Sequence, residues 1–210
     1  MKLPRLYPIL DVDLLERRKC PIEDAADGMA RAGAEILQWR CKRPPSRDDV
    51  AVAERIAEIC YRFHAQFVVN DRADLAMMLG AGLHLGQDDL PPAKVRKLMP
   101  NTAIGFSTHN ARQLISAQLE PVDYLAIGPI FATVSKEKAD PEVGIDRLRE
   151  WRPSSALPVV AIGGITRQSA RDVLEAGADS VAVISDLIPV NATRDTIRRR
   201  MEEWLTLLNT

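Results

Sequence analysis

The stretch Val68–Leu90, VVNDRADLAMMLGAGLHLGQDDL, decides the fold class because it contains two successive units of the same kind. An apolar run ends at Asn70-Asp71, a helical segment follows, and a second apolar run ends in Gly-Gln-Asp-Asp at Asp89. When strands alternate with helices, the carboxyl ends of the parallel strands share one face, where ligands bind. Carboxylates gathered there suggest a Mg²⁺ site, since Mg²⁺ takes oxygen ligands and often carries substrate phosphates. Helix capping is the simpler interpretation of one isolated Asp, but both clusters together favour the metal.

The same alternation runs along the whole chain. Strands are expected at 6–10, 35–39, 66–69, 82–85, 102–106, 124–127, 158–162 and 180–184. Helices are expected at 22–32, 47–63, 75–79, 92–98, 111–117, 145–151, 167–176 and 195–208. Repeated strand-then-helix order predicts parallel strands with right-handed crossovers. Eight such units in 210 residues predict a compact (β/α)8 TIM barrel of the α/β class, with residues 1–210 forming one catalytic domain.

Glycines and one long polar loop mark the boundaries between the predicted helices and strands. Gly33, Gly82 and Gly177 each stand between a helix and a strand, where a glycine just past the helix cap is expected. The segment 132–143 is the only long polar loop, and it follows a strand end. It is expected to be a mobile flap over the site, with a plain exposed loop as the alternative.

Composition narrows the classes of function. Hydrophobic residues make up 46% and charged residues 27%, as in ordinary globular proteins, and the net charge of −1 argues against a nucleic-acid scaffold. Any phosphate binding must therefore be local. Cys20, Cys41 and Cys60 are far apart, which fits a reducing compartment rather than a disulfide framework. With no apolar run long enough for a membrane span or signal peptide, a cytoplasmic protein without nucleic-acid or membrane partners is expected.

A cationic cluster follows the second predicted strand. Strand alternation places Gln38, Arg40 and Lys42 on one side, where a guanidinium, an ammonium and an amide could clamp an oxyanion. Surface basicity is the alternative. A second anion-binding region is expected at Gly163-Gly164, because loops after strands seven and eight form the recurrent phosphate site of such barrels. A tight turn would also explain the glycine pair.

Hydroxyl groups and a lysine complete the candidate site. Thr133 and Ser135 could hydrogen-bond a ligand, and Lys136 could neutralise a leaving group. Ser107 could equally contact a phosphate or cap the next helix. His84 and His109 are expected to pack or orient rather than react, and no Ser-His-Asp or Cys-His arrangement is evident. Two anion-binding regions, one with a metal, point to two phosphorylated small-molecule substrates.

At this point the chain resembles the thiamine-phosphate synthase family. The resemblance rests on ordered motifs: QWRCK, NDRADLA, HLGQDDLP, IGFSTH, DYLAIGPIFATVSK, VVAIGGIT and VAVIS. It implies a transferase of thiamine biosynthesis that joins hydroxymethylpyrimidine diphosphate to a thiazole phosphate, or its carboxylated form, releasing pyrophosphate. The chemistry we expect is dissociative, with a carbocation-like pyrimidine methylene and a diphosphate neutralised by Mg²⁺ and the cations.

The resemblance also implies roles for particular residues. The pyrimidine diphosphate would be held by Gln38, Trp39, Arg40, Cys41, Lys42, Asn70, Ser107 and Lys136; of these, Arg40, Lys42, Ser107 and Lys136 would act in catalysis. Asp71 and Asp89 would ligate Mg²⁺. The thiazole phosphate would be held by Thr133, Val134, Ser135, Gly164, Ile184 and Ser185. Cys41 stands where the family commonly has an acidic residue, which leaves its role open.

Two rival functions remain. A thiazole tautomerase of the same fold would need neither diphosphate nor Mg²⁺, with His109 as its candidate proton shuttle; the presence of Lys42, Asp71 and Asp89 argues against it. A non-catalytic sensor of a phosphorylated ligand is the second rival. An apolar outer helix surface could also support a homo-oligomer.

Overall fold

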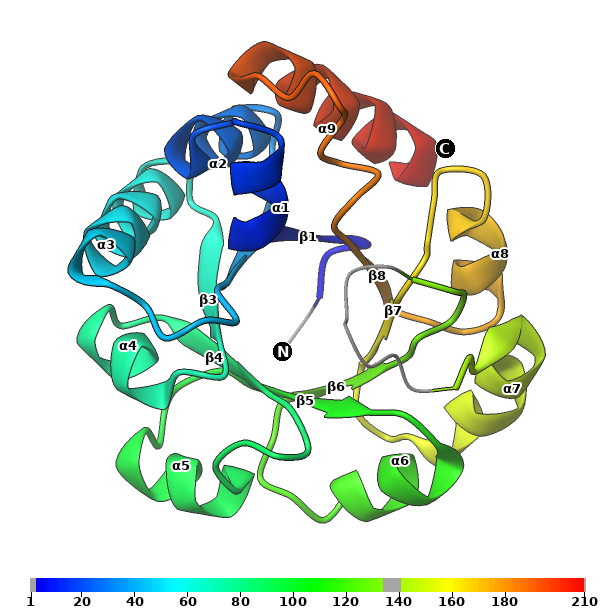
Figure 1. Ribbon diagram of the computed structural model, residues 1–210. Coiled ribbons are helices and arrows are strands. Elements are labelled where there is room, and N and C mark those ends of the chain that lie inside the picture. Colours follow the sequence, from blue (N-terminus) through cyan, green and yellow to red (C-terminus); the bar gives the residue numbers. More distant parts are fainter. Residues whose placement is uncertain (1–2, 134–140, 210) are drawn as a thin grey trace.

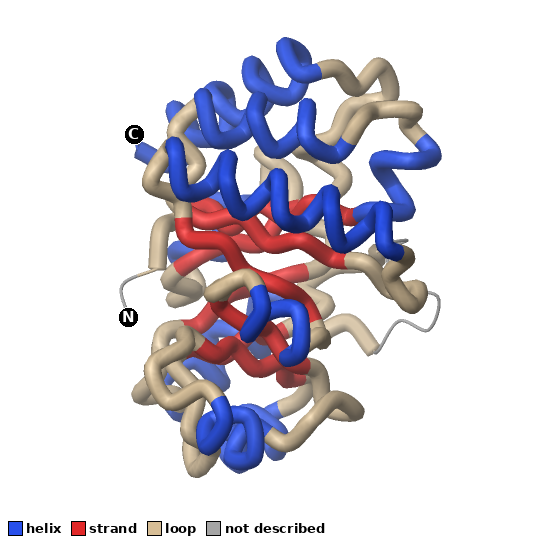
Figure 2. The backbone as a smooth tube through the Cα atoms, turned by 90° about the vertical axis from the view of Figure 1, so that its left-hand side faces the viewer, coloured by secondary structure: helices blue, strands red, loops and turns tan. Residues whose placement is uncertain are grey.

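The chain folds into a closed barrel of parallel strands surrounded by helices, which confirms the predicted (β/α)8 class. The computed structural model describes residues 3–133 and 141–209. The barrel strands follow one another in chain order, and the last pairs with the first. Figure 1 shows the helices as a ring outside the strands, and Figure 2 shows the strands enclosed between helices in the perpendicular view.

The bounds of the elements lie close to those predicted. The strands are β1 Leu6–Asp11, β2 Ile36–Arg40, β3 Gln66–Asn70, β4 Gly82–Leu85, β5 Ile104–Thr108, β6 Tyr124–Ile127, β7 Val159–Ile162 and β8 Ser180–Val183. The helices are α1 Val12–Arg17, α2 Ile22–Arg31, α3 Arg47–Arg62, α4 Ala73–Met78, α5 Pro92–Leu98, α6 Ala111–Ala117, α7 Gly144–Trp151, α8 Ala170–Glu175 and α9 Arg194–Asn209, with a 3-10 turn η1 at Arg152–Ser154.

Alternation along each strand divides the core into two layers. Outward side chains such as Leu37 and Val69 pack against the helices, whereas inward ones such as Ile36 and Val68 fill the barrel. Leu3, just before β1, belongs to the inner cluster and helps to close the amino-terminal end. The opposite end is therefore the one left available for a ligand.

Three local expectations differ from the structure. Helix α1 was not predicted; its short amphipathic run is stabilised by Asp11, whose Oδ1 accepts from the Leu14 amide at 2.9 Å. The glycine that ends α4 is Gly80, with a φ of +60°, whereas Gly82 is already the first residue of β4. Helix α8 begins at Ala170 rather than Arg167 because a hydrogen-bonded turn at Thr166–Ser169 comes first.

The packing of the barrel interior can be tested at Gly105 of β5. A Cβ at this position would lie 2.1 Å from Cζ of Tyr124, so the Tyr124 ring occupies the space that a side chain would need. We expect Gly105→Ala to lower the free energy of unfolding by about 1–3 kcal/mol, measured by urea denaturation, because the added methyl overpacks the barrel.

The matched control is the double variant Gly105→Ala/Tyr124→Leu. Removing the ring removes the clash, so the double variant should lose less stability than the two single changes added together. Strictly additive losses would contradict this description of the barrel interior.

Candidate active site

A cavity of about 480 Å³ opens at the carboxyl-terminal end of the barrel and is lined by side chains from every strand. Most of the residues predicted from the sequence meet there. Those on its wall are Gln38, Arg40, Lys42, Asn70, Asp71, Asp89, Ser107, Thr133, Gly164, Ile184 and Ser185. Because strand order fixes their positions, the acidic residues after β3 and β4 face the loops after β7 and β8 across the barrel.

Two of the predicted residues that the structure describes, Trp39 and Cys41, are not brought to this wall. Trp39 and Cys41 are 1% and 5% exposed, and they belong to the core layer between barrel and helices because they alternate with Gln38 and Arg40. The expectation that the whole QWRCK segment faces the substrate is therefore corrected for these two side chains. Val134, Ser135 and Lys136, like most of the expected flap, lie outside the described residues.

The charged part of the wall pairs cations with carboxylates. Lys42 Nζ lies 2.5 Å from Asp71 Oδ2. Arg40 forms an ion pair with Asp11, the residue at the end of the neighbouring strand β1. Since Asp11 also caps α1, its carboxylate holds the Arg40 guanidinium in one place. Sequence reasoning missed Asp11, although its position directly after a strand was a usable signal.

Asp71 and Asp89 form a close acidic pair. Burial, followed by a hydrogen bond with Asp71, raises the pKa of Asp89 to about 6. The Gly86 amide donates to Asp89 Oδ2 at 2.6 Å and holds this side chain on the wall. Asp71 adopts a left-handed φ of +64°, a conformation that costs energy in a non-glycine residue and tends to occur at functional sites.

Asn70 carries a buried polar group without a partner in the described part of the chain. The residue is 6% exposed and lines the cavity, and its side-chain Nδ2 has no hydrogen-bond partner among the residues the structure describes. A buried amide of this kind is normally satisfied. A ligand acceptor in the cavity would satisfy it.

Deeper in the barrel, five strands contribute to one polar chain. Gln38 Nε2 donates to the Tyr7 hydroxyl at 3.1 Å, and that hydroxyl lies 2.8 Å from the Tyr124 hydroxyl. His84 then links the two sides, with Nδ1 3.2 Å from the Tyr124 hydroxyl and Nε2 2.9 Å from Ser107 Oγ. All five residues line the cavity.

Burial keeps this chain neutral. It lowers the pKa of His84 to about 4 and raises the pKa of Tyr7 to about 12, and it also raises the pKa of Tyr124. An uncharged floor of donors and acceptors suits a neutral polar ring better than a phosphate. Sequence reasoning missed Tyr7 and Tyr124 because nothing in a single strand distinguishes them from core aromatic residues.

The structure shows the hydrogen-bonding environments of Ser107 and His109, whose roles the sequence left open. Ser107 does not cap α6, because Asn110 Oδ1 accepts from the Gln113 amide at 2.9 Å and is the cap. His109 has the orienting environment that was expected: its Nδ1 lies 2.7 Å from the Gly128 carbonyl oxygen, and its amide donates to Gln113 Oε1 at 2.7 Å.

Steric contacts explain why both positions of the glycine pair, Gly163 and Gly164, need glycine. Gly163 and Gly164 have φ values of +100° and +64°, and a Cβ on either would lie within 2.6 Å of Pro129 or Ala132 in the segment after β6. Glycine is therefore required for the tight contact between these loops. Both residues also line the cavity, which leaves their backbone available to a ligand.

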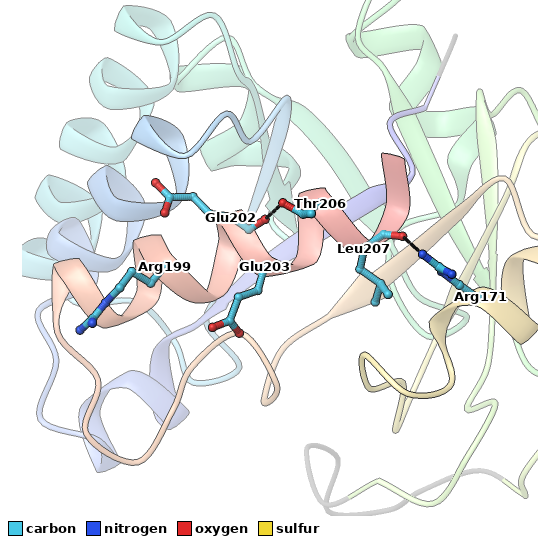
Figure 3. Close-up of a pocket in the computed structure, with 6 residues that line it drawn as sticks. All are labelled: Arg171, Arg199, Glu202, Glu203, Thr206 and Leu207. Atoms are coloured by element: carbon cyan, nitrogen blue, oxygen red, sulfur yellow. Dashed lines mark hydrogen bonds between the residues drawn. The ribbon is translucent and has the colours of Figure 1, made fainter. Parts of the chain in front are cut away.

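A second depression lies outside the barrel between α8 and α9. Figure 3 shows its lining residues, Arg171, Arg199, Glu202, Glu203, Thr206 and Leu207. Arg171 Nη2 donates to the Leu207 carbonyl oxygen at 3.1 Å across it. Since it holds none of the predicted site residues, the cavity inside the barrel remains the candidate active site.

Metal clusters and membrane-spanning helices are both absent from the described part of the chain. Within residues 3–133 and 141–209, no three His, Cys, Asp or Glu side chains are grouped as metal ligands. Over the same residues, no helix has the length and apolar character needed to cross a membrane.

Comparison with known proteins agrees with this geometry. The family model described as thiamine monophosphate synthase matches residues 6–187. The thiamine-phosphate synthase of Koribacter versatilis is 44% identical over 100% of this chain and 98% of its own, and that of Chloroflexus aurantiacus is 40% identical over 88% and 85%.

A solved structure of a related protein has the same fold as this chain. Thiamine phosphate pyrophosphorylase from Pyrococcus furiosus superposes with a TM-score of 0.79 at 32% identity, covering 96% of each chain. Family model, relatives and structure thus agree over nearly the whole length. The chain belongs to the thiamine monophosphate synthase family of transferases.

Proposed function

We propose that the barrel cavity makes thiamine phosphate by holding hydroxymethylpyrimidine diphosphate against its charged wall and a thiazole phosphate against the glycine pair. The observation that carries this proposal is the placement of two unlike walls across one cavity. Cations and carboxylates follow β2, β3 and β4, whereas glycine and hydroxyl groups follow β7 and β8. One cavity can thus hold two phosphorylated substrates face to face.

The charged wall would bind the diphosphate. Arg40 and Lys42 offer a planar fork and a point charge, and the Asn70 amide, which has no partner among the described residues, adds a donor. The acidic pair fits a Mg²⁺ ion, because two adjacent carboxylates need a countercharge and Mg²⁺ often binds through one or two carboxylates plus substrate phosphates. Held by Asp71 and Asp89, Mg²⁺ would supply positive charge to the diphosphate as it departs.

The neutral floor would bind the aminopyrimidine. Gln38, Tyr124 and His84 present donors and acceptors without a net charge, so they can orient the ring and exclude water. An electron-rich aminopyrimidine can stabilise positive charge on its methylene carbon. The carbon–oxygen bond to the diphosphate then breaks with its electron pair leaving on oxygen, where Arg40 and Lys42 stabilise the developing charge.

The opposite wall would present the acceptor. Thr133, Gly164 and Ser185 line the part of the cavity that faces the acidic pair. A thiazole phosphate anchored there would have its ring nitrogen directed at the methylene carbon, and the carbon–nitrogen bond forms from the nitrogen lone pair. This sequence needs no nucleophile from the protein.

A coupled assay tests the proposal. The protein, incubated with both substrates and Mg²⁺, should form thiamine phosphate and pyrophosphate in equal amounts, and EDTA should abolish this activity. Isomerisation of the thiazole carboxylate phosphate alone would instead identify a tautomerase. Binding of a phosphorylated ligand with no turnover would identify a sensor, and either result would overturn the proposal.

The charged wall should control turnover more than acceptor binding. We expect Lys42→Met and Asp71→Asn each to lower kcat by about 100-fold, because charge stabilisation of the leaving group is lost, with little change in the KM for thiazole phosphate. The matched control is Asp74→Asn on α4, which removes an exposed carboxylate paired with Arg72. Parallel loss of kcat and of thiazole phosphate affinity would contradict the assigned roles.

The buried imidazole predicts a pH dependence of stability. The pKa of His84 is lowered from 6.5 to about 4 in the folded chain, so the unfolded chain binds an extra proton between these values. The contribution of His84 to the free energy of unfolding should therefore fall as the pH decreases from about 6.5 to 4. The raised pKa of Asp89 contributes with the opposite sign below about pH 6, so a comparison with a His84 variant is needed to isolate the imidazole.

Urea denaturation across this pH range measures the effect. His84→Gln should show a shallower fall, whereas His64→Asn, which changes an exposed residue with a positive φ, should keep the parent slope. Identical slopes for the parent and His84→Gln would show that the imidazole is not held neutral by the fold.

A further inference from the structure

Asp186 joins the two loops that form the glycine-lined wall. It follows Ser185 in the loop after β8, and Arg167 lies in the turn that follows Gly164 after β7. Arg167 Nε donates to Asp186 Oδ2 at 3.1 Å. This contact connects the backbone on one side of the proposed acceptor site to the backbone on the other.

Helix α9 fixes this contact from behind. Trp204, which is fully buried, donates its indole Nε1 hydrogen to Asp186 Oδ2 at 2.9 Å. Arg200 Nη1 donates to the Asp186 carbonyl oxygen at 2.9 Å. Both the side chain and the backbone carbonyl of Asp186 are therefore hydrogen-bonded to α9.

Glu203 balances the charges around Asp186. It forms an ion pair with Arg167, and its Oε2 lies 3.2 Å from Arg200 Nε; Figure 3 draws it on α9. Two arginines are thus matched by two carboxylates. Because their charges are already paired, these arginines influence the cavity through loop position rather than by direct attraction of a phosphate.

The chain between Asp186 and the cavity is short and lies in a hydrogen-bonded turn. Ile184 and Ser185 line the cavity, and their carbonyl oxygens accept from the amides of Leu187 and Ile188 at 3.2 Å. The Asp186 side chain is 19% exposed and is not part of the cavity wall. Because Asp186 follows Ser185 directly and lies within this hydrogen-bonded turn, the contacts of its carboxylate constrain the position of the Ser185 backbone.

We propose that Asp186 and Arg167 form a clamp that sets the distance between the two phosphate-binding loops, which makes Asp186 a positioning residue for the acceptor phosphate. This inference rests on the proposed function, because it assigns the glycine-lined wall to the thiazole phosphate. It predicts that the clamp acts on acceptor binding and leaves the diphosphate wall across the barrel unchanged.

The test compares steady-state kinetics for both substrates. Asp186→Asn keeps an oxygen that can accept from Trp204 but removes the charge that binds Arg167. We expect the KM for thiazole phosphate to rise about tenfold, the amount expected when a charge-assisted hydrogen bond is lost. The KM for the pyrimidine diphosphate should change by less than about twofold.

A double-mutant cycle makes the assignment specific. Arg167→Met, whose side chain is partly exposed, should raise the same KM, and the double variant Arg167→Met/Asp186→Asn should be no worse than the single variants. Since Arg167→Met changes a partly exposed side chain, it keeps the test valid if Asp186→Asn does not fold. Additive effects in the double variant would show that the two residues act separately.

The matched control is Asp179→Asn. Asp179 lies at the other end of β8, where it accepts from Arg152 Nη2 at 3.0 Å and from the Val159 amide at 2.8 Å. Its loss should lower the unfolding temperature without changing either KM. An equal rise in the KM for thiazole phosphate in this variant would overturn the clamp, because general loosening of the barrel would then explain the result.

The outcomes separate the clamp from the proposed function. If the parent makes thiamine phosphate and Asp186→Asn has the parent KM values, the clamp alone is wrong. If the parent makes none, the proposed function is wrong, and calorimetric titration with thiazole phosphate then decides the clamp. Weaker binding to Asp186→Asn than to the parent supports it, and equal or undetectable binding to both overturns it.

Discussion

Closure of the parallel barrel is the constraint on which the other features depend. Each strand pairs with the next and β8 pairs with β1, so every strand ends at the same rim. Closure leaves no unpaired strand edge, and it divides the side chains of every strand into an inward and an outward set. The site follows from this geometry, because residues at eight separate places in the chain must meet around one opening.

The cavity separates charge from neutral polarity by depth. At the rim, Lys42 and Asp71 pair where solvent can reach them. Below the rim, burial holds His84 and Tyr7 in their neutral forms. A low-dielectric floor disfavours isolated charge and strengthens hydrogen bonds to an uncharged ring. The same molecule of substrate can therefore place its heterocycle inside the barrel and its phosphates at the rim.

Acidic residues at or beyond strand ends have a second role, which is to hold arginines. Asp11, the last residue of β1, binds Arg40 of β2, and Asp186 in the loop after β8 binds Arg167 in the loop after β7. In each pair the carboxylate also receives a further hydrogen bond, from the Leu14 amide or from the Trp204 indole. An arginine held in this way loses little freedom when a ligand binds, so its position is already set.

Sequence alone determined the fold class and the position of most of the site. The repeated strand-then-helix pattern predicted the barrel, and strand order placed Asp71, Arg40 and Gly164 at its rim, because these features depend only on local periodicity and on the shared direction of parallel strands. Alternation along β2 also separates Gln38 and Arg40 from Trp39 and Cys41, and the structure agrees with the alternation rather than with the family motif taken as one segment.

Only the tertiary structure decided which residues meet across the barrel. Tyr7 and Tyr124 are 117 positions apart, and their contact requires both closure and register. Likewise, Arg167 and Asp186 come together because β7 and β8 are neighbours with a particular register, and Trp204 reaches them only because α9 packs back against the loop. Such contacts have no local periodicity, since they arise from the summed geometry of distant elements.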